Sequence, residues 1–153
     1  MDKKIRIREA VLSDLKALLH FEQGVIAAER PYDLTLRDGT ISYYNLAQLI
    51  ASDRAVVVVA EDDGVLVGSG HATIKRARHY LNHEEYVNLG FMYTVPEHRG
   101  KGINKKIIEA LTAWAASKGL YEIRLTVYCD NAAAIKAYEK AGFRKHILQM
   151  RLA

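Results

Sequence analysis

Cysteine is almost absent from the chain, since Cys129 is the only one among 153 residues. A single thiol excludes an intrachain disulfide and fits the reducing cytoplasm. No apolar run approaches the ~20 residues that a membrane-spanning helix needs. The N-terminal segment also lacks the apolar stretch of a secretory signal. We therefore expect a cytoplasmic protein that does not cross a membrane.

Neither sign of charge dominates strongly, because 22 basic and 18 acidic side chains leave a net charge of +4. So mild an excess agrees with an anionic ligand but does not demand one. The basic stretch 75–79 is short and has no array of aromatic side chains for base stacking, so we rank nucleic-acid binding last. His79 and His83 lie four residues apart, but in a segment typical of a strand or loop, and we expect no metal site.

Length and periodicity predict a single domain, residues 1–153, with a mixed α/β fold. Alternating or continuous apolar residues indicate strands, whereas apolar residues three and four apart indicate helices. The expected strands cover 5–10, 55–60, 65–74, 87–95, 122–128 and 143–152. The expected helices begin near Asp14, Tyr44, Ile103 and Ala132, which gives the order β-α-α-β-β-β-α-β-α-β. Gly68 and Gly70 mark either a bulge or a close approach of the backbone.

The most informative stretch is a strand that runs into a basic turn with two glycines and then into a helix. The sequence Arg-Gly-Lys-Gly at 99–102 follows a strand that stops before Pro96. Glycine lets the backbone come close to a ligand, and the first N–H groups of a helix attract an anion. Arg99, Lys101 and Lys105 add positive charge at the same place. This pattern predicts a site for phosphate groups.

A second motif lies about thirty residues further on. Residues 131–143 follow the spacing N-x-x-A-x-x-x-Y-x-x-x-G-F, from Asn131 through Tyr138 to Phe143. Together with residues 95–103 and the order of elements, this segment resembles the GNAT-type acyl-CoA N-acyltransferase superfamily. The resemblance implies a central, mostly antiparallel sheet of about six or seven strands with helices on both faces. It also implies transfer of an acetyl group from acetyl-CoA to a primary amine.

The resemblance further implies which residues hold the coenzyme. The turn and the start of its helix would bind the pyrophosphate, through Arg99, Gly100, Lys101, Gly102, Ile103, Asn104 and Lys105. The strand before Pro96 would splay from its neighbour and offer backbone groups to the pantetheine arm, at Met92, Tyr93 and Thr94. Asn131 would cap its helix, alone or together with a contact to a pantetheine amide. Asn104 departs from the glycine or alanine that is common at this position.

Catalysis needs an acid for the leaving thiolate and a base for the amine. By resemblance Tyr138 is the acid, although the same ring would also pack well against Phe143. Glu84 and Glu85, at the entrance of the central strand, are our candidates for the base; two solvated acids are an equally good interpretation. For Cys129 we expect a buried or half-buried thiol rather than a nucleophile.

Three points stay open at the level of sequence. A non-catalytic module that senses acyl-CoA or another nucleotide would carry the same fold and the same turn. The acceptor, a small molecule or a protein amine, is not specified, because the segments 28–44 and 75–86 mix acidic and basic residues. Dimers are common among similar proteins, and no residue here decides for or against a homodimer.

Overall fold

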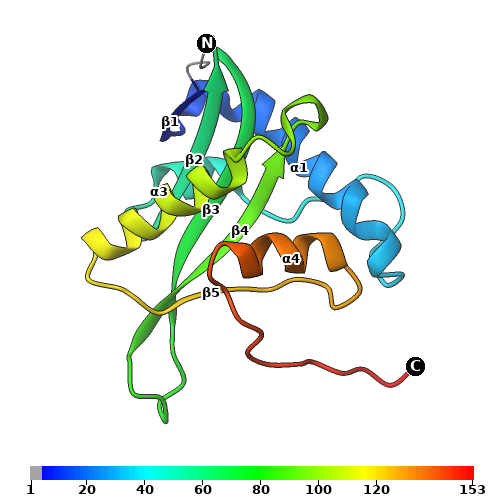
Figure 1. Cartoon of the computed structure of the whole chain (residues 1–153), viewed down its shortest axis with the longest axis vertical. Helices are drawn as coiled ribbons and strands as arrows, with labels where there is room; N and C mark the ends of the chain where they lie inside the picture. Colours follow the sequence, from blue (N-terminus) through cyan, green and yellow to red (C-terminus); the bar gives the residue numbers. More distant parts are fainter. Residues whose placement is uncertain (1–4) are drawn as a thin grey trace.

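Five strands form one sheet in the computed structural model, which describes residues 5–153 (Figure 1). Residues 1–4 of the predicted domain lie outside this part. The strands pair in sequence order, antiparallel from β1 to β4 and parallel between β4 and β5. Their bounds are β1 Ile5–Glu9, β2 Ala55–Asp62, β3 Val65–Arg76, β4 Glu85–Thr94 and β5 Ile123–Leu125. The expected mostly antiparallel sheet is confirmed.

Helices cover both faces of the sheet, as expected. The four α-helices are α1 Leu15–Glu29, α2 Leu46–Ala51, α3 Ile103–Ser117 and α4 Ala132–Lys140; three short 3-10 helices lie at Leu12–Asp14, Arg30–Tyr32 and Pro96–His98. The apolar stripe of α3 packs on one face of the sheet, and Tyr138 of α4 joins that core. The side chains of α1 and α2 fill the other face around Phe91. The valines of β2 divide between the two cores, which explains why this strand is apolar from Ala55 to Ala60.

A bulge interrupts the pairing of β3 with β4 in the middle of the sheet. The register shifts between Ser69 and His71, so that Phe91 and Met92 share one position opposite Gly70. Phe91 takes a positive φ of 56° at this point. The extra residue turns Phe91 towards α1 and Met92 towards α3. A β-carbon on Gly70 would lie 2.7 Å from Ile107, so the bulge and the close approach of a helix occur together.

Strands β4 and β5 separate soon after they meet. They pair only over Val87–Leu89 and Ile123–Leu125, whereas β4 continues to Thr94. Figure 1 shows the chain after β5 running away from β4, with α4 lying across the opening. The second half of β4 therefore has an edge that β5 does not cover. The expected splay is present in the structure.

The last expected strand does not form. Residues 144–153 have no regular secondary structure and are exposed, so the described part of the chain contains five strands instead of six or seven. The alternation of Leu148, Met150 and Leu152 suits a strand, but these side chains find no neighbouring strand and are 69–98% exposed. The two longest helices, α1 and α3, have 15 residues each. Across residues 5–153, no helix is long and apolar enough to cross a membrane.

Candidate functional site

The basic turn between β4 and α3 leaves a row of backbone donors free. The first helical hydrogen bond of α3 runs from Lys106 N–H to the Gly102 carbonyl. Among residues 5–153, no protein acceptor takes the N–H groups of 100–105. Gly100 and Gly102 both have a positive φ, 78° and 82°, and open space where a side chain would begin. These free donors at a helix N-terminus fit a pyrophosphate such as that of coenzyme A.

Two side chains fix the shape of this turn. Arg99 Nε donates to the Thr94 carbonyl at 2.9 Å, and its guanidinium lies 5.7 Å from the centre of the Tyr93 ring. His98 Nε2 lies 2.9 Å from the Asp62 carboxylate at the end of β2. Lys101 and Lys105 are exposed, and Asn104 is half-exposed in the first turn of α3. The turn is thus held from both sides, and its free lysines face solvent.

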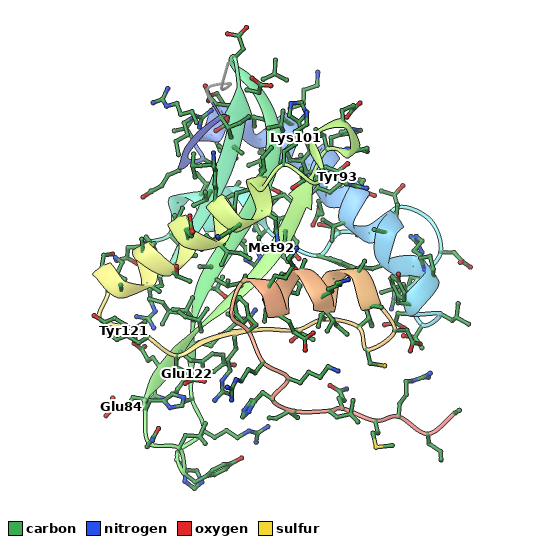
Figure 2. The ribbon with its side chains drawn as sticks, viewed as in Figure 1. Glu84, Met92, Tyr93, Lys101, Tyr121 and Glu122 are labelled. Atoms are coloured by element: carbon green, nitrogen blue, oxygen red, sulfur yellow. The ribbon has the colours of Figure 1, made fainter. Side chains whose placement is uncertain are left out.

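Strand β4 leads from this turn to the opening between β4 and β5 (Figure 2). Val95 N–H donates to Val67 of β3. Because backbone groups alternate along a strand, those of Met92 and Thr94 point to the opposite, uncovered edge. The Tyr93 ring packs at 5.0 Å from Phe21 in the core against α1. Of this strand segment, the backbone groups of Met92 and the N–H of Thr94 are therefore available to an extended ligand, whereas the Thr94 carbonyl already accepts from Arg99.

Helix α4 closes the opening. The Asn131 side chain accepts the Ala134 N–H at 3.2 Å, so the predicted cap is confirmed. The Tyr138 ring packs edge-on against Phe143 with 6.0 Å between centroids. Burial, and then the negative charge of Glu29, raise the pKa of the Tyr138 hydroxyl above its usual value of 10. Cys129 lies in the turn before α4 and is exposed, which corrects the expectation of a buried or half-buried thiol.

A cavity of about 90 Å³ lies where β4, β5, α1 and α4 meet. Met92 and Tyr138 line it, as do Glu29 from the end of α1 and Tyr44 from the segment before α2. Leu89, Leu125 and Val25 form its apolar walls. Burial raises the pKa of Tyr44 to about 12. One carboxylate and two tyrosine hydroxyl groups therefore line a cavity beside the uncovered edge of β4.

Glu29 is held in this cavity by a tyrosine, and that tyrosine is held by a second glutamate. The Tyr43 hydroxyl donates to Glu29 Oε1 at 2.8 Å. The carboxylate of Glu22, which is 1% exposed, accepts the backbone N–H groups of Tyr43 and Tyr44, both at 2.8 Å. Glu22 thereby anchors the segment that carries both tyrosines to α1. The position of Glu29 follows from this arrangement.

Glu84 and Glu85 lie far from the cavity. Figure 2 shows Glu84 at the hairpin end of the sheet, well away from Met92 and Tyr93. Glu85 begins β4 and forms an ion pair with Arg54. At about 3.3 Å per strand residue, Glu85 is roughly 16 Å from Gly90. The geometry gives these two glutamates no contact with the cavity and thus no support as the base.

Glu29 lies in the segment 28–44 that we expected to shape the acceptor pocket, but nothing local in the sequence distinguishes it as a candidate base. It is the last residue of a helix and precedes Arg30 and Pro31, a setting that is typical of an ordinary helix end. Its role depends on Tyr43 and on the opening beside β4, both far away in the chain. The one available signal was the pair of tyrosines at 43 and 44 in an otherwise polar segment. No group of three or more His, Cys, Asp or Glu side chains arranged to hold a metal occurs within 5–153.

Comparisons with known proteins agree with this geometry. A sequence model of the acetyltransferase (GNAT) family matches residues 21–143. An aminoglycoside N(6')-acetyltransferase type 1 from Salmonella typhimurium (strain LT2) is 26% identical over 118 residues, which cover 75% of this chain and 75% of that protein. The chain spans only 24% of the length of another curated relative that it matches. The family model thus matches most of the chain. The share of each relative that the match covers differs widely.

Solved structures show the same fold. A tetramutant of the BH1408 protein from Bacillus halodurans superimposes with a TM-score of 0.85 at 19% identity, covering 97% of this chain and 99% of that one. A predicted acetyltransferase from Clostridium acetobutylicum, described with acetyl-CoA, gives a TM-score of 0.72 at 17% identity and covers 98% and 96% of the two chains. The chain therefore shares its overall fold with these proteins.

Proposed function

The chain belongs to the acetyltransferase (GNAT) family and is an N-acetyltransferase with acetyl-CoA as its donor; we propose that it transfers the acetyl group directly, with Glu29 as base and Tyr138 as acid. The observation that carries this proposal is the cavity, which both side chains line beside the uncovered edge of β4. No serine or cysteine lines the cavity, and Thr126, which does line it, has no histidine among the other lining residues to activate it. A direct route needs no nucleophilic side chain.

Binding of acetyl-CoA is the first part of the proposal. Its pyrophosphate would take the free N–H groups of Gly100–Lys105, with Arg99, Lys101 and Lys105 as nearby charges. The pantetheine arm would follow the uncovered edge of β4 at Met92 to Thr94 and reach the α4 end at Asn131. The bound thioester supplies the acetyl group. Asn104 adds an amide in the first turn of α3, where glycine or alanine is common in the family.

Proton transfer is the second part. Glu29 would take a proton from the incoming ammonium, directly or through water, so that the amine nitrogen gains a free electron pair. The Met92 backbone N–H, on the uncovered edge, would polarise the thioester carbonyl. As the carbon–nitrogen bond forms and the carbon–sulfur bond breaks, Tyr138 would give its phenolic proton to the thiolate. The second proton that leaves the nitrogen as the amide forms would pass to the Tyr138 phenolate, directly or through water. The raised pKa of Tyr138 keeps that proton available at neutral pH.

The proposal is tested by calorimetry with acetyl-CoA and by thiol release with a panel of primary amines. The panel includes aminoglycosides, because a matched relative carries that substrate in its name. We expect binding and amine-dependent release of thiol. Binding without release from any amine would favour the non-catalytic sensor instead. No binding at high micromolar acetyl-CoA would contradict both.

Two further parts concern assembly and location. We place the chain in the cytoplasm, in keeping with its single, exposed cysteine. We also suggest a homodimer, because Ile147, Leu148, Met150 and Leu152 are 69–98% exposed on the C-terminal segment. Light scattering would give the particle mass, and hence the number of chains per particle, for the full chain and for a chain ending at Phe143. The same number of chains per particle in both would contradict a dimer that depends on this segment.

A further inference from the structure

A second carboxylate and two tyrosine rings form a group beyond the end of α1, where Asp33 and Tyr32 meet Tyr128 from the turn before α4. The Tyr128 hydroxyl donates to Asp33 Oδ2 at 2.8 Å. The rings of Tyr32 and Tyr128 lie nearly parallel, with 6.3 Å between centroids and 20° between planes. Asp33 Oδ1 accepts from the backbone N–H of Thr35 at 2.9 Å and also from its hydroxyl. These contacts join the segment after α1 to the turn before α4.

The charge of Glu29 also acts on Tyr128 of this group. Burial raises the pKa of Tyr128 to about 12, and the charges of Asp33 and Glu29 add to the rise. The same Glu29 holds the Tyr43 hydroxyl at 2.8 Å. Asp33 lies four residues after Glu29 in the chain, and each carboxylate accepts a hydrogen bond from a tyrosine hydroxyl. The cavity residue Glu29 and the group around Asp33 thus bring two acidic side chains and several tyrosines to the same end of α1.

Few positive charges oppose the two carboxylates. The Arg30 guanidinium donates to the carbonyls of Arg37 and Gly39, at 2.8 and 2.6 Å, and so stabilises the loop that follows it. Arg151, on the exposed C-terminal segment, is the cation that acts on Asp33. The hydrogen bonds of Thr35 hold the pKa of Asp33 below its usual value, and Tyr128 adds to this. Asp33 is consequently an anion at neutral pH.

We infer that the preferred acceptor is a slender amine with a second positive charge: Glu29 receives the reacting amine, and Asp33 with the Tyr32 and Tyr128 rings receives the other cation. This inference rests on the proposed function. A cation beside a tyrosine face and a carboxylate gains both ring and charge attraction. The cavity of about 90 Å³ admits an unbranched aminomethyl end. An acceptor with a carboxylate in place of the second cation meets repulsion from Asp33.

Three acceptors of equal length test the inference: an alkyl-1,n-diamine, the monoamine with the same chain, and the amino acid with a terminal carboxylate. The chain length is scanned from three to six methylene groups, and kcat/KM is measured for each compound. We expect the diamine to exceed the monoamine by about tenfold at the best length and the amino acid to be the poorest. Equal kcat/KM for the diamine and the monoamine at every length would overturn the inference.

Asp33→Asn locates the effect. We expect it to lower kcat/KM for the diamine about tenfold and to bring the diamine-to-monoamine ratio close to one. Asp38→Asn is the matched control, because Asp38 is exposed in the same loop, and we expect that variant to keep the wild-type ratio. Acetyl-CoA affinity, measured on each variant, checks that the fold is intact. An unchanged ratio in Asp33→Asn would overturn the inference.

The turnover of the three acceptors distinguishes a failure of this inference from a failure of the proposed function. Turnover of all three acceptors without preference contradicts only the inference. Absence of turnover with every amine, despite acetyl-CoA binding, contradicts the proposed function itself.

Discussion

The Tyr43 hydroxyl donates a hydrogen bond to Glu29 Oε1 at 2.8 Å, across 14 residues of sequence. This bond fixes one oxygen of the carboxylate and leaves Oε2 without a hydrogen bond within the part of the chain that the structure describes. Tyr138 lines the same cavity from the opposite helix. A carboxylate that is oriented by one oxygen and free at the other suits a base that accepts a proton from a bound ammonium.

Replacement of Tyr138 by phenylalanine tests the acid. The ring keeps its packing against Phe143, so we expect acetyl-CoA affinity and stability to stay close to wild type. Loss of the phenolic proton should lower kcat by roughly 100- to 10,000-fold. Because burial raises the pKa of this tyrosine above 10, the alkaline fall of wild-type kcat should lie above pH 10. Unchanged turnover in Tyr138→Phe would remove it from this role.

Replacement of Gly102 by alanine tests the phosphate turn. Gly102 has a φ of 82°, so a β-carbon there costs about 1 kcal/mol in stability and disturbs the row of free N–H groups. We expect weaker acetyl-CoA binding by calorimetry. Gly39→Ala is the matched control, since Gly39 has the same φ of 82° and the same open surroundings. Equal loss of affinity in both variants would show that strain alone, and not this turn, explains the effect.

Gly90 and His71 should be energetically coupled. A β-carbon on Gly90 would lie 2.7 Å from His71 Cε1, so we expect Gly90→Ala to destabilise the fold by about 1–3 kcal/mol. In the background of His71→Ala the imidazole is gone, and the same substitution should cost much less. Chemical unfolding of the two single variants and the double variant gives the coupling energy. Additive losses would mean that the imidazole is not the obstacle.

Burial of His71 predicts a dependence of stability on pH. The imidazole is 4% exposed, its Nδ1 has no hydrogen-bond partner among the described residues, and burial lowers its pKa to about 4. Between the unfolded value of 6.5 and the folded value of 4, the unfolded chain binds a proton that the folded chain does not. The free energy of unfolding should thus fall by up to about 1.4 kcal/mol per pH unit as pH drops through this window.

The variant His71→Asn isolates this effect from that of the carboxylates. Asp14, whose pKa is lowered chiefly by its hydrogen bond with Arg8, also costs stability in acid but at lower pH. The slope of unfolding free energy between pH 6.5 and 4 should be shallower in His71→Asn than in the wild type. Equal slopes would contradict a neutral, buried imidazole in the folded state.

The sequence predicted the elements whose signals are local. Helix 132–140 with its cap at Asn131, and the glycine turn at 99–102 that leads into α3, depend on short motifs with a direct physical cause. Glu29 could not be found in this way, because its place follows from Tyr43 and from the separation of β4 and β5. The segment 143–152 has the pattern of a strand, yet a strand needs an edge beside it. Pairing between distant segments decided both cases.

The most direct test of the account compares Glu29→Gln with Glu85→Gln. The amide at 29 keeps the size of the side chain and an oxygen for Tyr43, but it cannot take a proton from the acceptor. With acetyl-CoA affinity unchanged in both variants, we expect amine-dependent thiol release to fall roughly 100- to 10,000-fold in Glu29→Gln and to stay near wild type in Glu85→Gln. Wild-type release in Glu29→Gln, or a comparable loss in Glu85→Gln, would contradict the assignment of the base to this cavity.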